Sequence, residues 1–132
     1  CFDPENPKRM YLAAWPTTVN DSEEFGGLWK TEDAGINWVS CFNTSAHVYG
    51  VSVAQDNPET IYLTTFNSSV FRSDDRGMHW KRLGGYNFKW AKQPILDPYH
   101  QEMLYLTTFG SSIWYGPANG IDGPFEDVKS VD

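Results

Sequence analysis

The sequence predicts an all-β protein of about three four-stranded antiparallel sheets, and three observations support this fold class. An eight-residue unit at 31–38 recurs 42 positions later at 73–80, and a period of about forty residues is typical of a repeat architecture. A second motif, rich in Asp, Asn and Pro, occurs three times ahead of an alternating apolar segment. Eleven Gly and eight Pro suit many short strands with tight turns, and no stretch has helical periodicity.

The eight-residue unit predicts a turn that is held together by its own side chains. Its aspartate is placed to accept hydrogen bonds from backbone N–H groups of the turn, and its hydroxyl residue adds another bond. Its glycine supplies a positive φ that would strain a residue with a Cβ. Its tryptophan starts the returning strand and carries a large ring into a core. We therefore assign a structural role to both copies, which are Thr31, Asp33, Gly35 and Trp38, and then Ser73, Asp75, Gly77 and Trp80.

The second motif predicts a turn followed by a strand. Its three copies span 2–12, 53–63 and 96–106, and each ends in the pair Tyr-Leu. Asp, Asn and Pro favour the turn, and the apolar alternation that follows favours a half-buried strand. Two copies of the first motif and three of the second cover most of the chain.

Together these motifs resemble the Asp-box, or BNR, repeat of β-propellers in sialidases, sortilin-type receptors and xyloglucanase-like glycoside hydrolases. In those families the box lies between the third and fourth strands of each blade. The resemblance implies about three four-stranded antiparallel blades of a larger six- to eight-bladed propeller. Because neighbouring strands alternate in direction, the A–B and C–D turns share one rim of the blades, and the B–C and D–A loops share the opposite rim.

The repeat divides one structural unit of 132 residues into blades at 1–43, 44–88 and 89–132. Strands A to D are expected near 1–3, 10–15, 26–31 and 38–42 in the first blade and near 48–54, 61–66, 69–73 and 80–83 in the second. In the third they are expected near 91–97, 103–109, 112–115 and 125–128, after a decayed box at 116–120. Propellers need about four to eight blades to close. We therefore expect either a fragment of a longer propeller or a chain that completes its circle with other copies or partners.

Composition and charge exclude several classes of function. A net charge of −7 argues against nucleic-acid binding, and no apolar run is long enough to span a membrane. The three histidines lack metal-ligand spacing, so we predict neither a metal nor another cofactor. The cysteines, Cys1 and Cys41, fall on strands A and D of one blade, roughly 14 Å apart, which is too far for a disulfide. We expect two free, partly buried thiols.

The candidate ligand-binding residues lie in the B–C and D–A loops, where the resemblance implies that ligands bind. Aromatic faces beside amides and a lysine suit sugar recognition, because C–H faces stack on rings while hydroxyl groups bond to polar side chains. The simpler alternative is that these aromatics only fill the interfaces between blades. The candidates are Trp15, Phe66, Asn67, Tyr86, Asn87, Lys89, Trp90 and Phe109.

An enzymatic function lacks the residues that the resemblance implies. Xyloglucanase-like enzymes carry a catalytic Asp after strand B, in the pattern Tyr-x-x-Thr-Asp. In this chain Phe66 and Phe109 follow Tyr-Leu-Thr-Thr at that place, and Trp15 stands there in the first blade. Sialidases need an arginine cluster, whereas three of the four arginines here fall near the rim of the turns. The cluster Asp21, Glu23 and Glu24 supplies catalytic candidates on the loop rim, although a solvated loop explains it more simply.

Two functions therefore stay open. The first is a non-catalytic binding or scaffold module that recognises a glycan or a protein through its loop rim. The second is part of a sialidase-like or xyloglucanase-like hydrolase whose catalytic residues lie largely in other blades. The resemblance implies an extracellular or periplasmic location. Sequons at Asn20, Asn43 and Asn67 lie on the same rim and would be modified only in a secreted eukaryotic protein.

Overall fold

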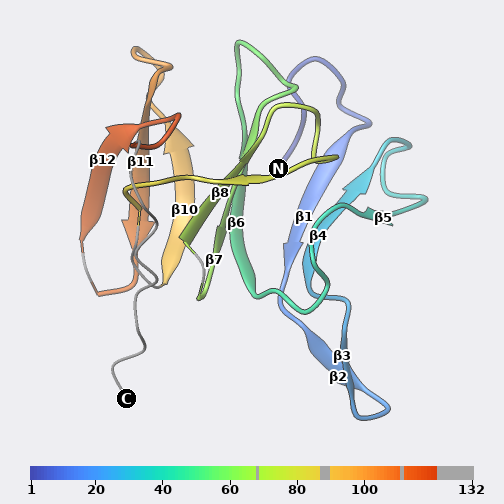
Figure 1. Cartoon of the computed structure of the whole chain (residues 1–132). Helices are drawn as coiled ribbons and strands as arrows, with labels where there is room; N and C mark the ends of the chain where they lie inside the picture. The colour runs from blue at the N-terminus through green and yellow to red at the C-terminus, as the bar shows by residue number, and fades with distance from the viewer. Residues whose placement is uncertain (68, 87–89, 111, 122–132) are drawn as a thin grey trace.

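The described residues fold into three antiparallel sheets and one protruding hairpin (Figure 1). The computed structural model describes residues 1–67, 69–86, 90–110 and 112–121, and within these ranges it contains strands and no helix. Blade 1 consists of β1 (Met10–Ala14), β4 (Gly27–Thr31) and β5 (Val39–Ser40). Blade 2 consists of β6 (Val48–Val53), β7 (Ile61–Thr65), β8 (Ser69–Ser73) and β9 (Lys81–Arg82), and blade 3 of β10 (Ala91–Leu96), β11 (Met103–Thr108) and β12 (Ile113–Pro117).

The strand order in each blade follows the chain, and all neighbouring strands are antiparallel. Figure 1 shows the blades side by side, with blade 2 in the middle. This arrangement confirms the predicted all-β fold class with blades of three or four strands. The expected first strand of blade 1 is reduced to one bridge between Phe2 and Met10, and the strand expected near 125–128 lies outside the described residues.

The connection after β1, which was expected to be a loop between the second and third strands, contains regular structure. It forms a hairpin of β2 (Thr17–Val19) and β3 (Ser22–Glu24). Asn20 and Asp21 join the strands with φ values of 50° and 62°, and such a pair of left-handed residues is favoured in two-residue hairpins because it matches the twist of the strands. The β-branched run Thr17–Val19 ahead of Asn-Asp was the sequence signal for this hairpin.

The hydrophobic core lies between the blades. One cluster joins Tyr11 and Leu28 of blade 1 to Ile61 and Leu63 of blade 2. A second cluster joins blade 2 to blade 3, and it contains Tyr62, Val70, Leu83, Tyr86, Leu104, Leu106 and Ala118. Strand β7 is therefore buried along its whole length on both faces, and successive residues of β7 serve opposite interfaces because strand side chains alternate.

The pairing registers show which residues are equivalent in the three blades. Met10 pairs with Thr31, Ile61 with Ser73, and Leu104 with Gly116. The same register makes Tyr11, Tyr62 and Tyr105 equivalent, and likewise Leu12, Leu63 and Leu106. The blades are thus three copies of one packing unit.

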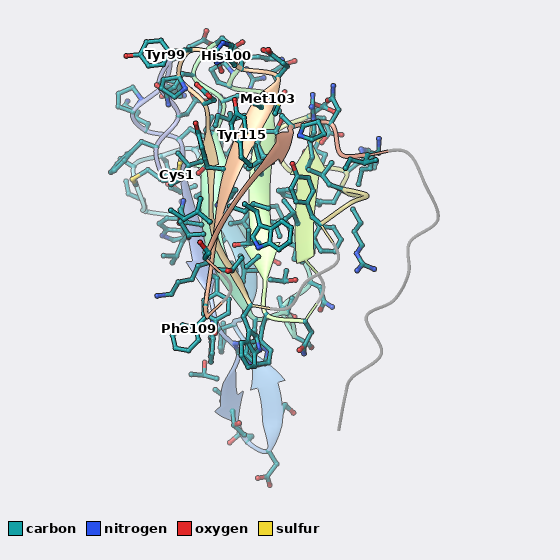
Figure 2. The ribbon with its side chains drawn as sticks, turned by 90° about the vertical axis from the view of Figure 1, so that its left-hand side faces the viewer. Cys1, Tyr99, His100, Met103, Phe109 and Tyr115 are labelled. Carbon is teal, nitrogen blue, oxygen red and sulfur yellow. The ribbon has the colours of Figure 1, made fainter. Side chains whose placement is uncertain are left out.

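Two rims separate the connections. Figure 2 shows Tyr99 and His100 at one end of the molecule, and Phe109 at the other end, next to the hairpin. We call the first end the turn rim, where β4 and β8 end and β1, β7 and β11 begin. We call the second end the loop rim, where β1, β7 and β11 end and β6 and β10 begin.

Two predicted burials need correction. Trp38 does not enter a core, because it is 37% exposed, whereas its equivalent Trp80 packs against Phe42 at 5.5 Å and donates its indole N–H to the Cys41 carbonyl at 2.7 Å. A neighbouring blade therefore covers Trp80 and leaves Trp38 open. Both cysteines are free, but Cys1 is exposed and only Cys41 is partly buried, with burial raising the pKa of its thiol to about 11.

Candidate functional site

A continuous row of aromatic rings crosses the loop rim from blade 1 to blade 3. Trp15 contacts His47 with ring centres 4.9 Å apart, and His47 lies 6.1 Å from Phe66. Phe66 lies 6.0 Å from Trp90, and Trp90 lies 6.3 Å from Phe109. Three of these side chains remain substantially open to solvent, with exposed fractions of 48% for Trp15, 42% for Trp90 and 65% for Phe109. A solvent-facing apolar row of this length is more than the fold needs to pack its blades.

The repeat itself generates the row. Trp15, Phe66 and Phe109 each follow the second strand of their blade directly, while His47 and Trp90 each precede an innermost strand. Backbone hydrogen bonds connect four of these positions in sequence. Phe66 N–H donates to the His47 carbonyl at 2.9 Å, Trp90 N–H to Phe66 at 3.0 Å, and Phe109 N–H to Trp90 at 3.1 Å. The main chain therefore sets the positions of these residues.

Two equivalent irregularities add side chains to the row. The register shifts between Val48 and Gly50 in β6 and between Ala91 and Gln93 in β10. The residues within these shifts are Tyr49, whose ring lies 5.0 Å from Trp15 and 6.1 Å from Phe66, and Lys92, whose ammonium lies 5.9 Å from the centre of the Phe109 ring. Bulges commonly re-aim a side chain next to a functional site, and here one brings a ring and the other a cation.

Trp90 has a strained backbone, with a φ of 64°. A bulky residue in the left-handed region is a genuine outlier, at a cost on the order of 1–3 kcal/mol. Hydrogen bonds on both sides, to Phe66 and from Phe109, hold this conformation. Such strain concentrates at functional sites, so the outlier supports a functional role for this part of the row.

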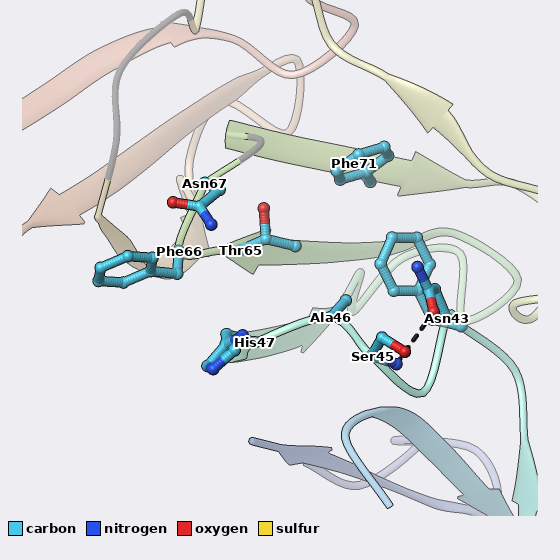
Figure 3. A pocket seen from close by; sticks show the side chains of 9 residues that line it. Asn43, Ser45, Ala46, His47, Thr65, Phe66, Asn67 and Phe71 are labelled. Atoms are coloured by element: carbon cyan, nitrogen blue, oxygen red, sulfur yellow. Dashed lines mark hydrogen bonds between the residues drawn. The ribbon is translucent and has the colours of Figure 1, made fainter. Parts of the chain in front are cut away.

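A pocket of about 280 Å³ opens beside the row, between the end of blade 1 and blade 2 (Figure 3). Phe66 and His47 belong to both the row and the pocket lining. Asn67 and Asn43 are exposed amides in the lining, and Asn43 accepts a hydrogen bond from the Ser45 backbone N–H at 3.0 Å. The site therefore combines ring faces with amide donors and acceptors. The other lining residues are Phe42, Ser45, Ala46, Thr65 and Phe71.

The structure brings together four of the predicted ligand-binding aromatic residues and separates one from them. Trp15, Phe66, Trp90 and Phe109 form the row, whereas Tyr86 is buried between blades 2 and 3 and donates its hydroxyl to the Pro117 carbonyl at 2.8 Å. Burial raises the pKa of Tyr86 to about 12. Asn67 lines the pocket, and Asn87 and Lys89 lie outside the described residues.

The sequence interpretation did not select Tyr49 or Lys92 for the site. Both stand inside the expected innermost strands, where alternation alone does not reveal a bulge. Their equivalent places in the repeat, each two residues after His47 or Trp90, were the available signal.

The carboxylates of the turn rim are occupied by structural bonds. Asp33 accepts the Asn37 backbone N–H at 2.8 Å and the Thr31 hydroxyl at 2.8 Å, and hydrogen bonds from Asn37 and then Thr31 lower the pKa of Asp33 to about 2. Asp75 accepts the His79 backbone N–H at 2.8 Å, and this bond leads the causes that hold its pKa well below the ordinary range.

Hydroxyl groups and glycines complete both turns. Thr31 and Ser73 accept the N–H groups of Gly35 and Gly77 at 3.0 and 2.8 Å. These glycines have φ values of 92° and 87°. We call Thr31–Trp38 and Ser73–Trp80 the carboxylate turns.

Three arginines are also occupied away from the row. Arg9 bonds Asp3 and Glu32 at 2.8 and 2.7 Å. Arg72 and Arg76 bond Asp74 and Glu59, at 2.7 and 3.0 Å. These pairs accompany the carboxylate turns, so these three side chains do not form an anion-binding cluster on the loop rim.

Asp21 is the catalytic candidate whose side chain the structure describes. It is exposed at the turn of the hairpin. Figure 1 shows the hairpin extending away from the three blades. Glu23 and Glu24 belong to β3 of the same hairpin. Within the described part of the chain, no group of three or more His, Cys, Asp or Glu side chains is arranged to hold a metal ion, and no helix there is long and apolar enough to cross a membrane.

Comparisons with known proteins identify the architecture through solved structures. No protein-family model matches the chain, and no curated protein matches it. The GH74 xyloglucanase from Xanthomonas campestris superposes with a TM-score of 0.64 and 21% identity over 82% of this chain and 19% of that enzyme. The Niastella koreensis GH74 enzyme gives 0.63 and 17% identity over 81% and 16% of the two chains, and an ancestral GH74 enzyme gives 0.60 and 21% over 92% and 19%.

These similarities support a propeller-like fold. The identities are low, so the similarity concerns the fold and carries no activity with it. The chain spans about a fifth of the length of the solved structures it matches.

Proposed function

We propose that this chain is a segment of an Asp-box β-propeller that binds a glycan on its loop rim, without catalysing a reaction there. The observation that carries the proposal is the aromatic row from Trp15 to Phe109. A linear glycan presents successive C–H faces, which stack on aromatic rings, and hydroxyl groups, which bond to amides. The pocket amides beside Phe66 supply the second kind of contact.

The rigidity of the row favours binding. Four of its positions, from His47 to Phe109, are joined by backbone hydrogen bonds, so little conformational entropy is lost when a ligand orders the rings. Aromatic side chains also lose few rotamers on binding. A protein ligand would contact the same rings. The binding experiment below distinguishes a glycan ligand from a protein ligand.

The same positions argue against catalysis within this segment. In the xyloglucanase-like enzymes that the chain resembles, the catalytic Asp follows strand B. Here Trp15, Phe66 and Phe109 occupy those places and belong to the aromatic row. The described turn-rim carboxylates Asp33 and Asp75 are committed to their turns. An extracellular or periplasmic location belongs to the same proposal.

Binding is tested by titrating the chain with xyloglucan, mixed-linkage β-glucan and an unrelated folded protein, using calorimetry. We expect saturable binding to at least one glucan. Replacing Trp90 or Phe109 by alanine should weaken it at least about tenfold, or about 1.4 kcal/mol. Tyr99→Ala is the matched control, because Tyr99 is 89% exposed on the opposite rim (Figure 2). Equal losses in the control, or binding only to protein, would contradict the proposal.

A second function is favoured by one specific observation, the similarity of the fold to GH74 enzymes. In this alternative the segment belongs to a glycoside hydrolase whose catalytic residues lie largely in other blades. Release of reducing ends from xyloglucan, measured together with binding, separates the two. Turnover that is abolished by Asp21→Asn or Glu24→Gln while binding is retained would establish the hydrolase and overturn the non-catalytic proposal.

A further inference from the structure

Both internal interfaces of this chain join the same two kinds of sheet face. We define the forward face of a blade as the side that carries the tyrosine of its second strand (β1, β7 or β11). The same side carries an apolar residue of the third strand (β4, β8 or β12). In blade 1 these are Tyr11 and Leu28, which pack against Ile61 and Leu63 of blade 2. In blade 2 the equivalent residues, Tyr62 and Val70, pack against Leu104 and Leu106 of blade 3. We call the side that receives them the rear face.

The described structure leaves one face of each kind open to solvent. Tyr105 is 37% exposed in blade 3, whereas its equivalents Tyr11 and Tyr62 are each 2% exposed. Leu12 on the rear face of blade 1 is 51% exposed, whereas its equivalents are fully buried. A forward face therefore stands open at one end of the described structure and a rear face at the other.

Further residues enlarge both open faces. Ile113, at the position of the fully buried Leu28 and Val70, is 64% exposed. Trp38 enlarges the rear face of blade 1, at the position where Trp80 of blade 2 is covered by Cys41 and Phe42 of blade 1. Exposed apolar surface of this extent indicates an interaction site.

The open forward face is less polar than the two internal ones. Lys30 and Arg72 reach from their forward faces to carbonyl oxygens of the next blade, Arg76 at 3.5 Å and Ala118 at 3.3 Å. Tyr115 holds the equivalent position in blade 3, where it lies 4.4 Å from the Tyr105 ring and donates its hydroxyl to Asp97 at 2.9 Å. The hydroxyl of Tyr115 is thereby satisfied inside the blade, so an apolar partner suffices.

We propose that the forward face of blade 3 binds the rear face of blade 1 in a second copy of this chain. The chain already buries this combination of faces twice, at its two internal interfaces. Each copy has an open forward face that fits the open rear face of the other copy. The contact joins two different surfaces of the chain. In a closed pair it forms twice, related by a two-fold axis, so that both surfaces of both copies are covered. With three blades in each copy the circle contains six, within the range in which propellers close.

Assembly would extend the candidate site. The aromatic row begins at Trp15 in blade 1 and ends at Phe109 in blade 3. The head-to-tail contact places Trp15 of the second copy after Phe109, because equivalent residues follow each other from blade to blade. The second copy therefore contributes to the row, and the row becomes continuous around the axis.

The test is light scattering of the purified 132-residue chain after size exclusion over a wide concentration range. We expect twice the mass of one chain. Leu12→Glu blocks the rear face and Ile113→Glu blocks the forward face, so each variant alone should be monomeric. Both positions are exposed within one chain, so the variants should keep their fold, which far-ultraviolet circular dichroism checks. Tyr99→Glu on the turn rim is the matched control and should leave the dimer intact.

Mixing the two monomeric variants provides the decisive measurement. An equimolar mixture of Leu12→Glu and Ile113→Glu retains one unaltered pair of faces, so it should form a dimer that neither variant forms alone. A face that binds its own kind does not produce this complementation. A monomeric wild-type chain, a dimer unaffected by either variant, or a mixture that stays monomeric would overturn the proposal. Long filaments in place of dimers would overturn the closed circle.

Discussion

At the scale of single residues, position within the repeat decides what a side chain does. Asp33 and Asp75 use their carboxylates for the backbone N–H groups of Asn37 and His79, and the charge makes those hydrogen bonds stronger than neutral ones. Trp38 and Trp80 differ in exposure although they end equivalent motifs, because a neighbouring blade covers only the second.

The carboxylate turns predict a specific dependence of stability on pH. Bonding lowers the pKa of both aspartates below the value of about 3.9 expected in the unfolded chain. Their contribution to stability is therefore complete above about pH 5 and declines as the pH falls through the folded-state pKa. Asp75→Asn should lower the thermal midpoint at pH 7, and the gap to the wild type should narrow below about pH 4. Asp21→Asn is the control on an exposed turn, and a gap independent of pH would contradict the prediction.

At the scale of elements, β7 and the β2–β3 hairpin represent opposite extremes. Every residue of β7 is buried, since each face of the strand meets another blade. The hairpin has two strands, and the described side chains of β2 are all exposed. An isolated two-stranded hairpin is marginally stable in water, so the two elements should respond very differently to mutation.

Leu63→Ala should destabilise the fold by about 2–5 kcal/mol, because Leu63 is fully buried between blades 1 and 2 and its truncation leaves a cavity. Val19→Ala in the hairpin should change stability by no more than about 0.5 kcal/mol. Urea denaturation followed by tryptophan fluorescence measures both. Comparable losses of unfolding free energy in the two variants would show that packing between blades 1 and 2 does not dominate the stability of the fold.

Asp21→Gly should strengthen the hairpin without affecting the blades. Asp21 has a φ of 62°, which glycine adopts without strain, and Asn-Gly is a preferred pair for a turn of this kind. Hydrogen exchange of the β2 and β3 amides should slow several-fold, while exchange in β7 stays unchanged. Slower exchange in β7 as well would mean that the hairpin folds cooperatively with the blades.

At the scale of the whole molecule, blades 2 and 3 approach closely where the inner strands β6 and β10 meet. A Cβ on Gly50 of β6 would lie 2.3 Å from the Lys92 carbonyl oxygen. Side chains add to this contact, since Thr64 donates to the same carbonyl at 2.6 Å and Gln93 donates to the Val51 carbonyl at 3.1 Å. Ser52 also donates to the Pro94 carbonyl. The spacing of blades 2 and 3 therefore depends on a residue without a side chain.

Gly50→Ala should separate these blades, cost about 1–3 kcal/mol by overpacking, and change the near-ultraviolet circular dichroism of the aromatic row. Gly110→Ala serves as the comparison, because its Cβ would meet no atom within 4 Å although its φ is 90°. Backbone strain should cost it about 1 kcal/mol, with the dichroism of the row retained. Loss of the aromatic signal only in Gly110→Ala would refute this account of the blade spacing.

The architecture could be predicted well from sequence because the repeat ties local turns to strand order. The carboxylate turns, the inner strands β6 and β10 and the aromatic ends of β1, β7 and β11 follow from spacing alone. The site was predicted only in part. Tyr86 was assigned to the rim because its loop lies there, yet its ring points into an interface. Tyr49 and Lys92 depend on bulges, which alternation cannot reveal.

The backbone bonds that join His47, Phe66, Trp90 and Phe109 have a consequence for how such a surface can change. Each position is held by its amide and carbonyl groups, which every residue except proline possesses. A substitution at one of these positions can therefore change the side chain while the neighbouring backbone keeps its conformation. Single substitutions in the aromatic row can therefore alter ligand preference with little need for compensating substitutions in the blades.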